Sequence, residues 1–365
     1  MQQQITFQRA SAIREARLPE RLANAKRAFT TRRVDLSKAS RIIRSGVTPA
    51  PGDLVLARVT GIGQHRRIEN LHGRRCDLFV GDEIIVAYGN RYAPDQFEAF
   101  VPGDLGECHL VAGGGVAARM TVKHASMKQP TRIEPIGLLG DSSGAVMNLR
   151  DFTSRHEPAP CRKAPVRIVV AGSSMNAGKT TTVASLIRGL TLAGFRVGAA
   201  KLTGTGSGGD LWSMIDSGAA AALDFTDAGH ASTFGLDTGV LTDVAGHLLA
   251  ALDEHSCDVV ICEIADGLLQ QETAALLEVS KQKGWFDGLI FAAGDAAGAA
   301  YGANWLVERQ HDLIAISGLL TASPLASREA ASATGLPIVG IQQLTDPVEV
   351  AKLIFSKPPV LKQVA

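Results

Sequence analysis

The pattern of apolar positions changes character near residue 166 of this 365-residue chain. Before that point, apolar residues come in short runs separated by Gly-Asp pairs, such as Gly52-Asp53 and Gly81-Asp82. Short apolar runs bounded by turn residues are typical of strands in a small barrel or sandwich. The sequence therefore predicts a small all-β domain over residues 51–152, with strands over 54–59, 78–80, 84–86, 109–111 and 133–139.

After residue 166, apolar runs alternate with longer segments of helical periodicity. We expect strands over 166–171, 196–201, 259–264, 289–293, 313–316 and 338–341, and helices over 179–193, 211–222, 244–254 and 272–283. Strands that alternate with helices form a parallel sheet covered on both faces. The fold class predicted for residues 166–365 is therefore α/β, with a parallel sheet between helices.

The two segments that flank the β domain have their own composition. Residues 1–50 carry 11 basic and 3 acidic side chains, a net charge of +8, and show a loose apolar stripe interrupted at Pro19. We expect a basic helical leader that docks on the acidic remainder of the chain or on a sister subunit. Nucleic acid, an anionic membrane and an organellar address are the alternatives. Residues 153–165 contain three prolines and no periodicity, which indicates a linker.

Composition narrows the class of protein. A chain with 45% apolar and 20% charged residues is not largely disordered. No charge-free apolar run reaches the roughly 18 residues that a membrane span requires, so no membrane association is predicted. The five cysteines show no Cys-x-x-Cys spacing, which favours reduced thiols in the cytoplasm.

The strongest motif joins the first strand of the α/β domain to the helix after it. An apolar run enters a loop of small residues, which ends in Gly-Lys-Thr at the start of a helix. Backbone N–H groups and the helix dipole make such a loop a phosphate site. The lysine reaches the β and γ phosphates and the threonine hydroxyl binds magnesium. The predicted nucleotide-binding residues are Gly172, Ser173, Ser174, Met175, Asn176, Ala177, Gly178, Lys179, Thr180 and Thr181.

The loop departs from the usual P-loop pattern at its first glycine. Ser173 occupies the usual glycine position, and the glycine stands one residue earlier, at Gly172. In this respect the segment resembles dethiobiotin synthetase and the cobyrinic acid diamide synthases. The signature lysine of the related dimer-switch ATPases would fall at Ser174 and is absent. The resemblance covers about residues 166–345 and implies an ATP- and Mg²⁺-dependent enzyme.

Two polar residues follow the second strand of this domain. Lys201 and Asp210 flank a glycine-rich stretch at the carboxyl end of the strand, where a loop can wrap closely around an anion. In dethiobiotin synthetase a lysine at this position contacts substrate and phosphate, and a nearby aspartate helps to hold magnesium. The resemblance therefore implies a catalytic role for Lys201 and a metal-ligand role for Asp210.

An acidic residue also ends the apolar strand that begins near residue 259. Glu263 stands where a Walker B carboxylate would meet the magnesium shell, and it takes the glutamate position of the dethiobiotin synthetase motif. The predicted metal ligands are thus Thr180, Asp210 and Glu263. Asp266 could bind a second magnesium, orient a nucleophile or cap the next helix, and we include it with Lys179 and Lys201 as a candidate catalytic residue.

Three further stretches carry less specific signals. Ser317 follows the fifth strand, where related synthetases recognise the nucleotide base through an asparagine, so the base remains open with ATP as the first expectation and GTP not excluded. Asp224, Asp227 and His230 could form a metal or proton-transfer cluster, or a plain loop. The segment around Arg91, with the Gly113-Gly114-Gly115 run, could form a substrate or partner surface, or a structural plug.

The leading hypothesis is an enzyme that activates a small anionic substrate, most simply a carboxylate, by phosphoryl transfer of the ligase or kinase type. The alternative is a nucleotide-gated protein that acts on a protein or cofactor partner. A homodimer is implied by the resemblance alone. Nucleic acid is not expected as a partner, because the β segment lacks interleaved basic and stacking residues.

Overall fold

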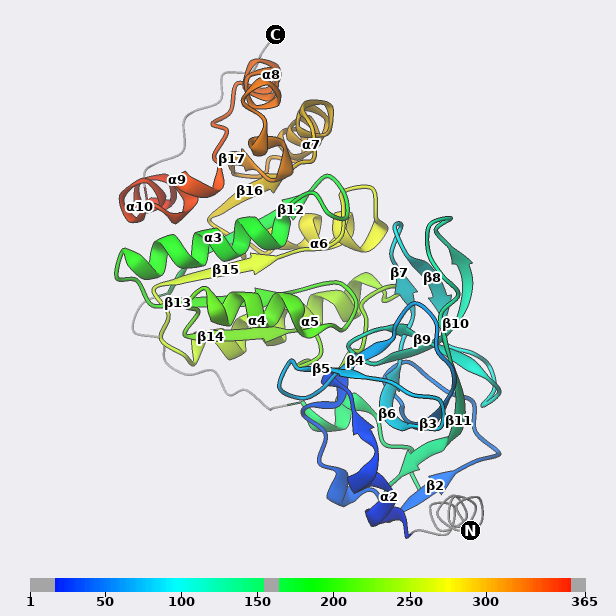
Figure 1. Ribbon diagram of the computed structural model, residues 1–365. Coiled ribbons are helices and arrows are strands. Elements are labelled where there is room, and N and C mark those ends of the chain that lie inside the picture. Colours follow the sequence, from blue (N-terminus) through cyan, green and yellow to red (C-terminus); the bar gives the residue numbers. More distant parts are fainter. Residues whose placement is uncertain (1–16, 154–163, 356–365) are drawn as a thin grey trace. The chain divides into compact units, whose positions relative to one another are not determined.

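The computed structural model describes residues 17–153 and 164–355, and within them the chain divides into two compact units (Figure 1). The first unit contains the described residues up to Thr153, together with Thr205–Gly208 and Gly229–Ser232. The second contains the rest of the described chain. Most of the predicted linker and the first 16 residues of the predicted leader lie outside the described residues.

The first unit contains a closed ring of five strands. β3 (Leu54–Gly61) pairs antiparallel with β6 (Glu83–Tyr88) and with β11 (Thr131–Gly140). β9 (Cys108–Ala112) pairs with β11 and with β10 (Val116–Lys123), and β10 pairs in parallel with β6. The parallel pairing returns to the strand next to β3, so the sheet closes on itself as a barrel.

Both faces of β3 and β6 are buried over most of their length, which explains their apolar runs. On β3, Leu54 and Leu56 enter one apolar cluster, whereas Val55 and Ala57 enter the other. Shorter strands attach to the ring or pair beside it: β1 (Lys26–Arg27), β2 (Arg41–Ile43), β4 (Arg67–Glu69), β5 (Arg75–Asp77), β7 (Arg91–Tyr92) and β8 (Phe97–Phe100). Three single-turn 3₁₀ helices complete the unit: η1 (Phe29–Thr31), η2 (Leu36–Lys38) and η3 (Leu149–Phe152).

The structure differs from the helical leader predicted over residues 1–50. Among its described residues, only α2 (Leu18–Asn24) is an α-helix. Pro19 lies in the first turn of α2, a position that proline tolerates because the missing N–H has no helical partner. β1 then pairs in parallel with β6, and Phe29 is fully buried. The basic segment is therefore built into the β unit, because its apolar residues complete the core.

A second difference concerns the strand predicted over residues 78–80. β5 ends at Asp77, and Phe79 and Val80 are exposed on a turn that Gly81 completes with a φ of 97°. Only Leu78 of the three is buried. The apolar run therefore belongs to a turn, since two of its three side chains have no core to enter.

The second unit contains a six-stranded sheet in which every pairing is parallel. The spatial order is β14-β13-β15-β12-β16-β17. The strands are β12 (Val166–Gly172), β13 (Val197–Lys201), β14 (Ala221–Asp224), β15 (Val259–Glu263), β16 (Gly288–Ala292) and β17 (Leu313–Ser317).

Helices cover both faces of this sheet (Figure 1), as the alternating pattern predicts. One face packs against α3 (Lys179–Leu192), α4 (Gly208–Asp216), α9 (Ile341–Thr345) and α10 (Pro347–Phe355). The other packs against α5 (Thr238–Asp253), α6 (Gln271–Gln282), α7 (Ala296–Glu308) and α8 (Pro324–Thr334). A short 3₁₀ helix, η4 (Leu319–Ala322), follows β17. In the described part of the chain, no helix combines the length and apolar character needed to cross a bilayer.

Two predicted elements of this unit are wrong. The helix expected over 211–222 ends at Asp216, and Gly218, with a φ of 106°, turns the chain into β14. The strand expected over 338–341 is a single bridge between Ile338 and Ile316, after which α9 begins. Both errors arise because a short apolar run fits a strand or a buried helix end equally well.

The strand order places one loop in a special position. β12 lies between β15 and β16, whereas the next strand in sequence, β13, lies beyond β15. The connection after β12 thus runs toward one edge of the sheet, and the connection after the neighbouring β16 runs toward the other edge. Between two such strands a crevice opens at the carboxyl ends. The loop after β12 contains the Gly-Lys-Thr motif and occupies this crevice.

Candidate nucleotide and metal site

The loop between β12 and α3 forms a tight turn that ends at the first residue of the helix. Asn176 and Gly178 both have positive φ values, 62° and 97°. Ser173 donates its N–H to the carbonyl oxygen of Ala292 at 2.9 Å, which ties the loop to the end of β16. The unpaired N–H groups and the positive dipole end of α3 therefore face the loop, an arrangement suited to a phosphate.

The unusual position of the first glycine has a steric cause. A Cβ atom at Gly172 would lie 2.8 Å from Cγ of Lys179 and 3.0 Å from the carbonyl oxygen of Ala292. The Lys179 side chain thus passes directly over the backbone of residue 172. Lys179 is only 6% exposed, and its Nζ donates to the carbonyl oxygen of Ser174 at 2.9 Å. Burial lowers the pKa of Lys179, against the opposing effect of Glu263 and Asp266.

The three predicted metal ligands come together at the carboxyl end of the sheet. Thr180 Oγ1 lies 3.0 Å from Asp210 Oδ1 and 3.3 Å from Glu263 Oε1. Glu263 is 1% exposed, and its Oε2 has no hydrogen-bond partner among the described residues. A buried carboxylate oxygen without a partner is costly, so the geometry fits a cation at this position.

The composition of this donor set favours magnesium over a transition metal. The set offers one hydroxyl and two carboxylates, and the described residues contain no group of three or more His, Cys, Asp and Glu side chains that could hold a metal. Mg²⁺ is usually held by one or two carboxylates, with waters and substrate phosphates completing its octahedron. The set therefore fits a magnesium ion that a nucleotide would help to bind.

Lys201 offsets part of the negative charge of the two carboxylates. Its ammonium group forms an ion pair with Asp210, and its Nζ lies 3.8 Å from Glu263 Oε1. Burial by itself would lower the pKa of Lys201, but the two carboxylates outweigh it and raise that pKa. Burial also raises the pKa of Glu263. At Asp210 burial acts in the same direction, but Lys201, Thr180 and Lys179 together outweigh it and lower the pKa. The cluster thus keeps a cation beside an ionised Asp210.

A cavity of about 340 Å³ opens in front of this cluster. Lys179, Thr180, Lys201, Asp210 and Glu263 all line it, and so does Asp266. Asp266 does not cap the following helix, since Gln270 is the N-cap residue of α6. The backbone N–H of Asp266 donates to Gln270 Oε1 at 2.8 Å. Two of the roles considered from the sequence therefore remain for Asp266, which are to bind a second magnesium and to orient a nucleophile.

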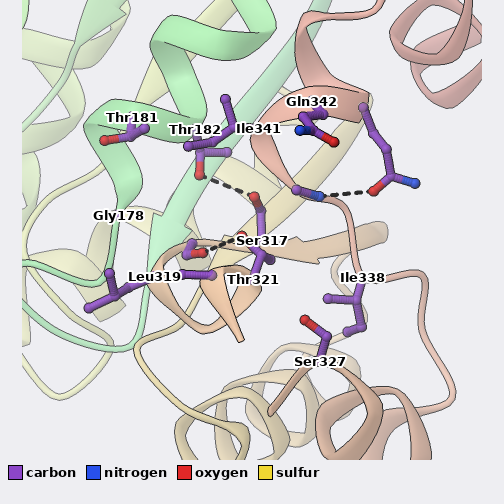
Figure 2. Close-up of a pocket in the computed structure, with 14 residues that line it drawn as sticks. Gly178, Thr181, Thr182, Ser317, Leu319, Thr321, Ser327, Ile338, Ile341 and Gln342 are labelled. Atoms are coloured by element: carbon purple, nitrogen blue, oxygen red, sulfur yellow. Dashed lines mark hydrogen bonds between the residues drawn. The ribbon is translucent and has the colours of Figure 1, made fainter. Parts of the chain in front are cut away.

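A second cavity, of about 720 Å³, shares Gly178 and Thr181 with the first (Figure 2). Its walls come from the start of α3, the turn after β17 and the segment that enters α9. None of its lining residues is charged: they are Gly178, Thr181, Thr182, Ser317, Gly318, Leu319, Thr321, Ala322, Ser327, Ile338, Gly340, Ile341, Gln342 and Gln343. An apolar cavity of this size, next to a phosphate loop, has room for a nucleoside.

Ser317 lies in this cavity wall, but its hydroxyl is already engaged. Ser317 Oγ donates to the carbonyl oxygen of Val339 at 2.8 Å. It also accepts from Thr182 Oγ1 at 3.3 Å, a bond that Figure 2 shows. A hydroxyl has one hydrogen to donate, so Ser317 has no further hydrogen to offer a base. Base recognition by Ser317 stays a prediction, now limited to an acceptor role.

One residue of the site escaped the sequence analysis. Gly318 has a φ of 99°, and a Cβ atom there would lie 2.4 Å from the carbonyl oxygen of Ala177. That same oxygen accepts the N–H of Leu319 at 2.9 Å. Gly318 therefore lets the turn after β17 support the phosphate loop. A glycine directly after a buried strand was the available signal.

The other candidate clusters have structural roles. Asp224 Oδ1 accepts the N–H of Thr226 at 2.8 Å, and Asp227 Oδ2 accepts the N–H of Asp224 at 2.9 Å, so both carboxylates stabilise the turn after β14. Burial, with a smaller effect of Arg150, lowers the pKa of His230 to about 4. Arg91 is 6% exposed and donates to Gln96 Oε1 at 2.8 Å.

Comparison with known proteins adds little to this geometry. No protein-family model and no curated protein matches the chain. The signal recognition particle receptor FtsY of Elizabethkingia anophelis is similar in structure at 17% identity and a TM-score of 0.36, covering 54% of this chain and 68% of that one. The cell division protein FtsY of Thermotoga maritima matches at 22% identity and a TM-score of 0.34, covering 57% of this chain and 74% of that one. The signal recognition particle 54 kDa protein of Aeropyrum pernix, solved with GDP, matches at 19% identity and a TM-score of 0.36. The match covers 57% of this chain and 50% of that one.

These likenesses carry no argument about activity, because identities stay below 25% and TM-scores below 0.5. None of the three is a dethiobiotin synthetase, so the finer resemblance drawn from the sequence gains nothing from them. The geometry of the second unit is by itself that of a P-loop domain. It combines a parallel sheet, a phosphate loop at the switch point of that sheet, and the strand-end carboxylate of Glu263 beside Thr180.

Proposed function

We propose that this chain binds a nucleoside triphosphate with Mg²⁺ and hydrolyses it, and that the bound nucleotide controls the state of the loop between Lys201 and Asp210. One observation carries the proposal: the Thr180 hydroxyl lies within 3.3 Å of both Asp210 and Glu263, beside the buried Lys179. This is the donor set that a P-loop domain presents to a magnesium nucleotide.

Each residue has a distinct task in this scheme. The backbone N–H groups at the start of α3 and the Lys179 ammonium would bind the phosphates, and Thr180, Asp210 and Glu263 would hold the metal. When bound, magnesium supplies charge that stabilises the transferring phosphoryl group. Lys201 now pairs with Asp210, and it would turn toward the phosphates once the carboxylates contact the metal. Phosphoryl transfer needs such placed charge more than covalent chemistry by the protein.

The gating part of the proposal rests on where the loop is anchored. Lys201 and Asp210 belong to the second unit, whereas Thr205–Gly208, between them, belongs to the first. A change at either end of this loop would therefore act on a segment integrated into the β unit.

A second candidate function is phosphoryl transfer to a small anion such as a carboxylate, of the ligase or kinase type. The cavity of about 340 Å³ favours it, because Lys201 and Asp266 line a space beyond the phosphate loop. Lys201 could neutralise an attacking substrate oxygen, as the resemblance to dethiobiotin synthetase implies. Completion of this pocket across a homodimer interface, also implied by the resemblance, stays a prediction.

ATP is the nucleotide that the larger cavity favours. Guanine presents adjacent N–H donors, which a carboxylate accepts best, and none of the described residues that line this cavity is a carboxylate. Adenine needs one acceptor and one donor, which backbone groups and the amides of Gln342 and Gln343 can supply. GTP is the competitor that a binding assay should include.

The test measures Mg²⁺-dependent phosphate release from ATP and GTP by the wild-type chain and by Lys179→Ala. We expect at least a hundredfold loss in the variant, since removal of one preorganised charge-stabilising donor costs about 3 kcal/mol. Lys352→Ala, an exposed lysine on α10, is the matched control and should behave as wild type. Full turnover by Lys179→Ala would refute the nucleotide assignment.

The two candidate functions separate in the same assay. Pools of small carboxylates and amines should leave phosphate release unchanged if the protein is a gated hydrolase. Strong stimulation by one pool, abolished in Lys179→Ala, would establish the phosphoryl-transfer function instead.

A further inference from the structure

The loop between Lys201 and Asp210 is held at its centre by residues of the first unit. Thr205–Gly208 belongs to that unit, and α4 begins at Gly208. Asp210 therefore lies in the first turn of a nine-residue helix whose starting residue is fixed by the β unit. The groups that hold Gly208 in place consequently influence where Asp210 stands.

Glu69 provides the strongest of these contacts. The N–H of Gly208 donates to Glu69 Oε2 at 2.7 Å, and Ser207 Oγ lies 3.2 Å from the same oxygen. Glu69 is 5% exposed and faces Arg75 across the β4–β5 pair, with Arg75 Nε 3.4 Å from Glu69 Oε1. The first N–H groups of a helix have no partner within it, and a carboxylate there also complements the helix dipole.

A close backbone approach holds the same segment from another side. A Cβ atom at Gly114 would lie 2.2 Å from the carbonyl oxygen of Gly206 and 2.7 Å from Cα of Ser207. Gly206 also donates its N–H to the carbonyl oxygen of Ala231 at 2.8 Å. The Gly113-Gly114-Gly115 run therefore lies directly against this loop.

We propose that Glu69 is a positioning residue for the metal ligand Asp210. The inference rests on the proposed function, because it takes Asp210 as a ligand of magnesium. Gly208 and Asp210 are two residues apart in one helical turn, so loss of the Glu69 contact lets that turn fray. Fraying moves Asp210 away from Thr180, which it contacts at 3.0 Å. The contact between Glu69 and Gly208 thereby supports the metal affinity of Asp210.

The test titrates Mg²⁺ into the full chain with a fluorescent N-methylanthraniloyl derivative of ATP. Glu69→Ala should raise the Mg²⁺ concentration for half-maximal binding about tenfold, which is the usual cost of losing a supporting contact to a metal ligand. Binding of the nucleotide in EDTA should not change. Glu69→Gln keeps an acceptor oxygen for Gly208 and should restore most of the wild-type affinity.

Two controls make the titration decisive. Glu134→Ala removes an exposed carboxylate from β11 of the same unit and should leave the titration unchanged. Circular dichroism of Glu69→Ala establishes that the variant is folded. An unshifted Mg²⁺ midpoint in folded Glu69→Ala, or an equal shift in Glu134→Ala, would overturn the positioning role.

A second readout is independent of nucleotide binding. Trp212 lies within α4, so a background of Trp285→Phe and Trp305→Phe leaves it as the only tryptophan of the chain. Glu69→Ala should shift the emission of Trp212 without any ligand, and Glu69→Gln should not. If the wild-type chain binds no nucleotide, the proposed function fails, and the Trp212 emission alone then decides the positioning role: a shift supports it and constancy overturns it.

Discussion

Each unit places a glutamate among cations, Glu83 partly buried and Glu263 fully buried, but the two glutamates differ in how fully their oxygens are used. In the first unit, Arg21 donates to both oxygens of Glu83, at 2.9 and 2.7 Å, and Arg58 donates to one of them at 2.9 Å. In the second unit, Glu263 has Thr180 at 3.3 Å and Lys201 at 3.8 Å from Oε1. Its Oε2 has no hydrogen-bond partner among the described residues.

This difference separates a structural ion network from a binding site. The two-pronged contact of Arg21 with Glu83 satisfies the carboxylate completely and adds geometric specificity. Burial opposes ionisation of Glu83, but the two arginines outweigh it and lower its pKa. At Glu263 burial dominates and raises the pKa, and a cavity opens in front of the group. Burial of charge therefore indicates a ligand only where the protein leaves the charge incompletely paired.

The largest effect on stability is expected from Glu83→Ala, which would sharpen the comparison. The substitution leaves Arg21 and Arg58 without their carboxylate, and removal of one partner of a buried ion pair costs about 3 kcal/mol. Urea unfolding should show this loss, and hydrogen exchange should locate it in β6. Nucleotide binding should not change. A loss no larger than that of Glu134→Ala would contradict the structural assignment.

Glu263→Gln should have the opposite signature. The half-maximal Mg²⁺ concentration for nucleotide binding should rise about tenfold, because an amide is a poor replacement for an anionic ligand. Stability should change by less than about 1 kcal/mol, since the substitution removes a buried charge that is incompletely paired. Glu349→Gln, on the exposed side of α10, is the control. A large loss of stability with normal Mg²⁺ dependence would place Glu263 in the structural class.

The smallest effect is a pH dependence of the first unit. Burial, followed by the nearby Arg91, lowers the pKa of His65 to about 4. Since this lies below the ordinary value near 6.5, the unfolded chain takes up the proton first as the pH falls, and stability decreases between pH 6.5 and about 4. The loss at pH 5 should be about 1 kcal/mol after allowance for the partly exposed ring.

Circular dichroism melts across this pH range check the prediction against His65→Gln. In the variant, stability should decrease less steeply as the pH falls, because the contribution of His65 is lost. The decrease that remains should include the contribution of His230, whose pKa is also lowered. An unchanged slope in His65→Gln would show that the ring is protonated in the folded state. His65 would then behave as a solvated charge and not as a buried neutral group.

Local patterns were sufficient for most elements of the P-loop domain. The strand, small-residue loop and helix around Lys179 depend on neighbouring residues, so the sequence alone predicts them. β14 and the end of α4 were missed, because the boundary at Gly218 depends on packing. In the first unit, the basic segment was assigned as helix, because nothing local indicates that β1 pairs with β6.

By itself the sequence determined the residue types of the site, because motif spacing is a local property of the chain: Lys179 and Thr180 at the start of α3, Asp210 in the first turn of α4, and Glu263 at the end of β15. Only the tertiary structure decided three further features. It closed the barrel through the pairing of β6 with β10, left Glu263 Oε2 without a partner among the described residues, and brought Glu69 to the first residue of α4. Each of these depends on contacts between residues far apart in the chain, which no local pattern encodes.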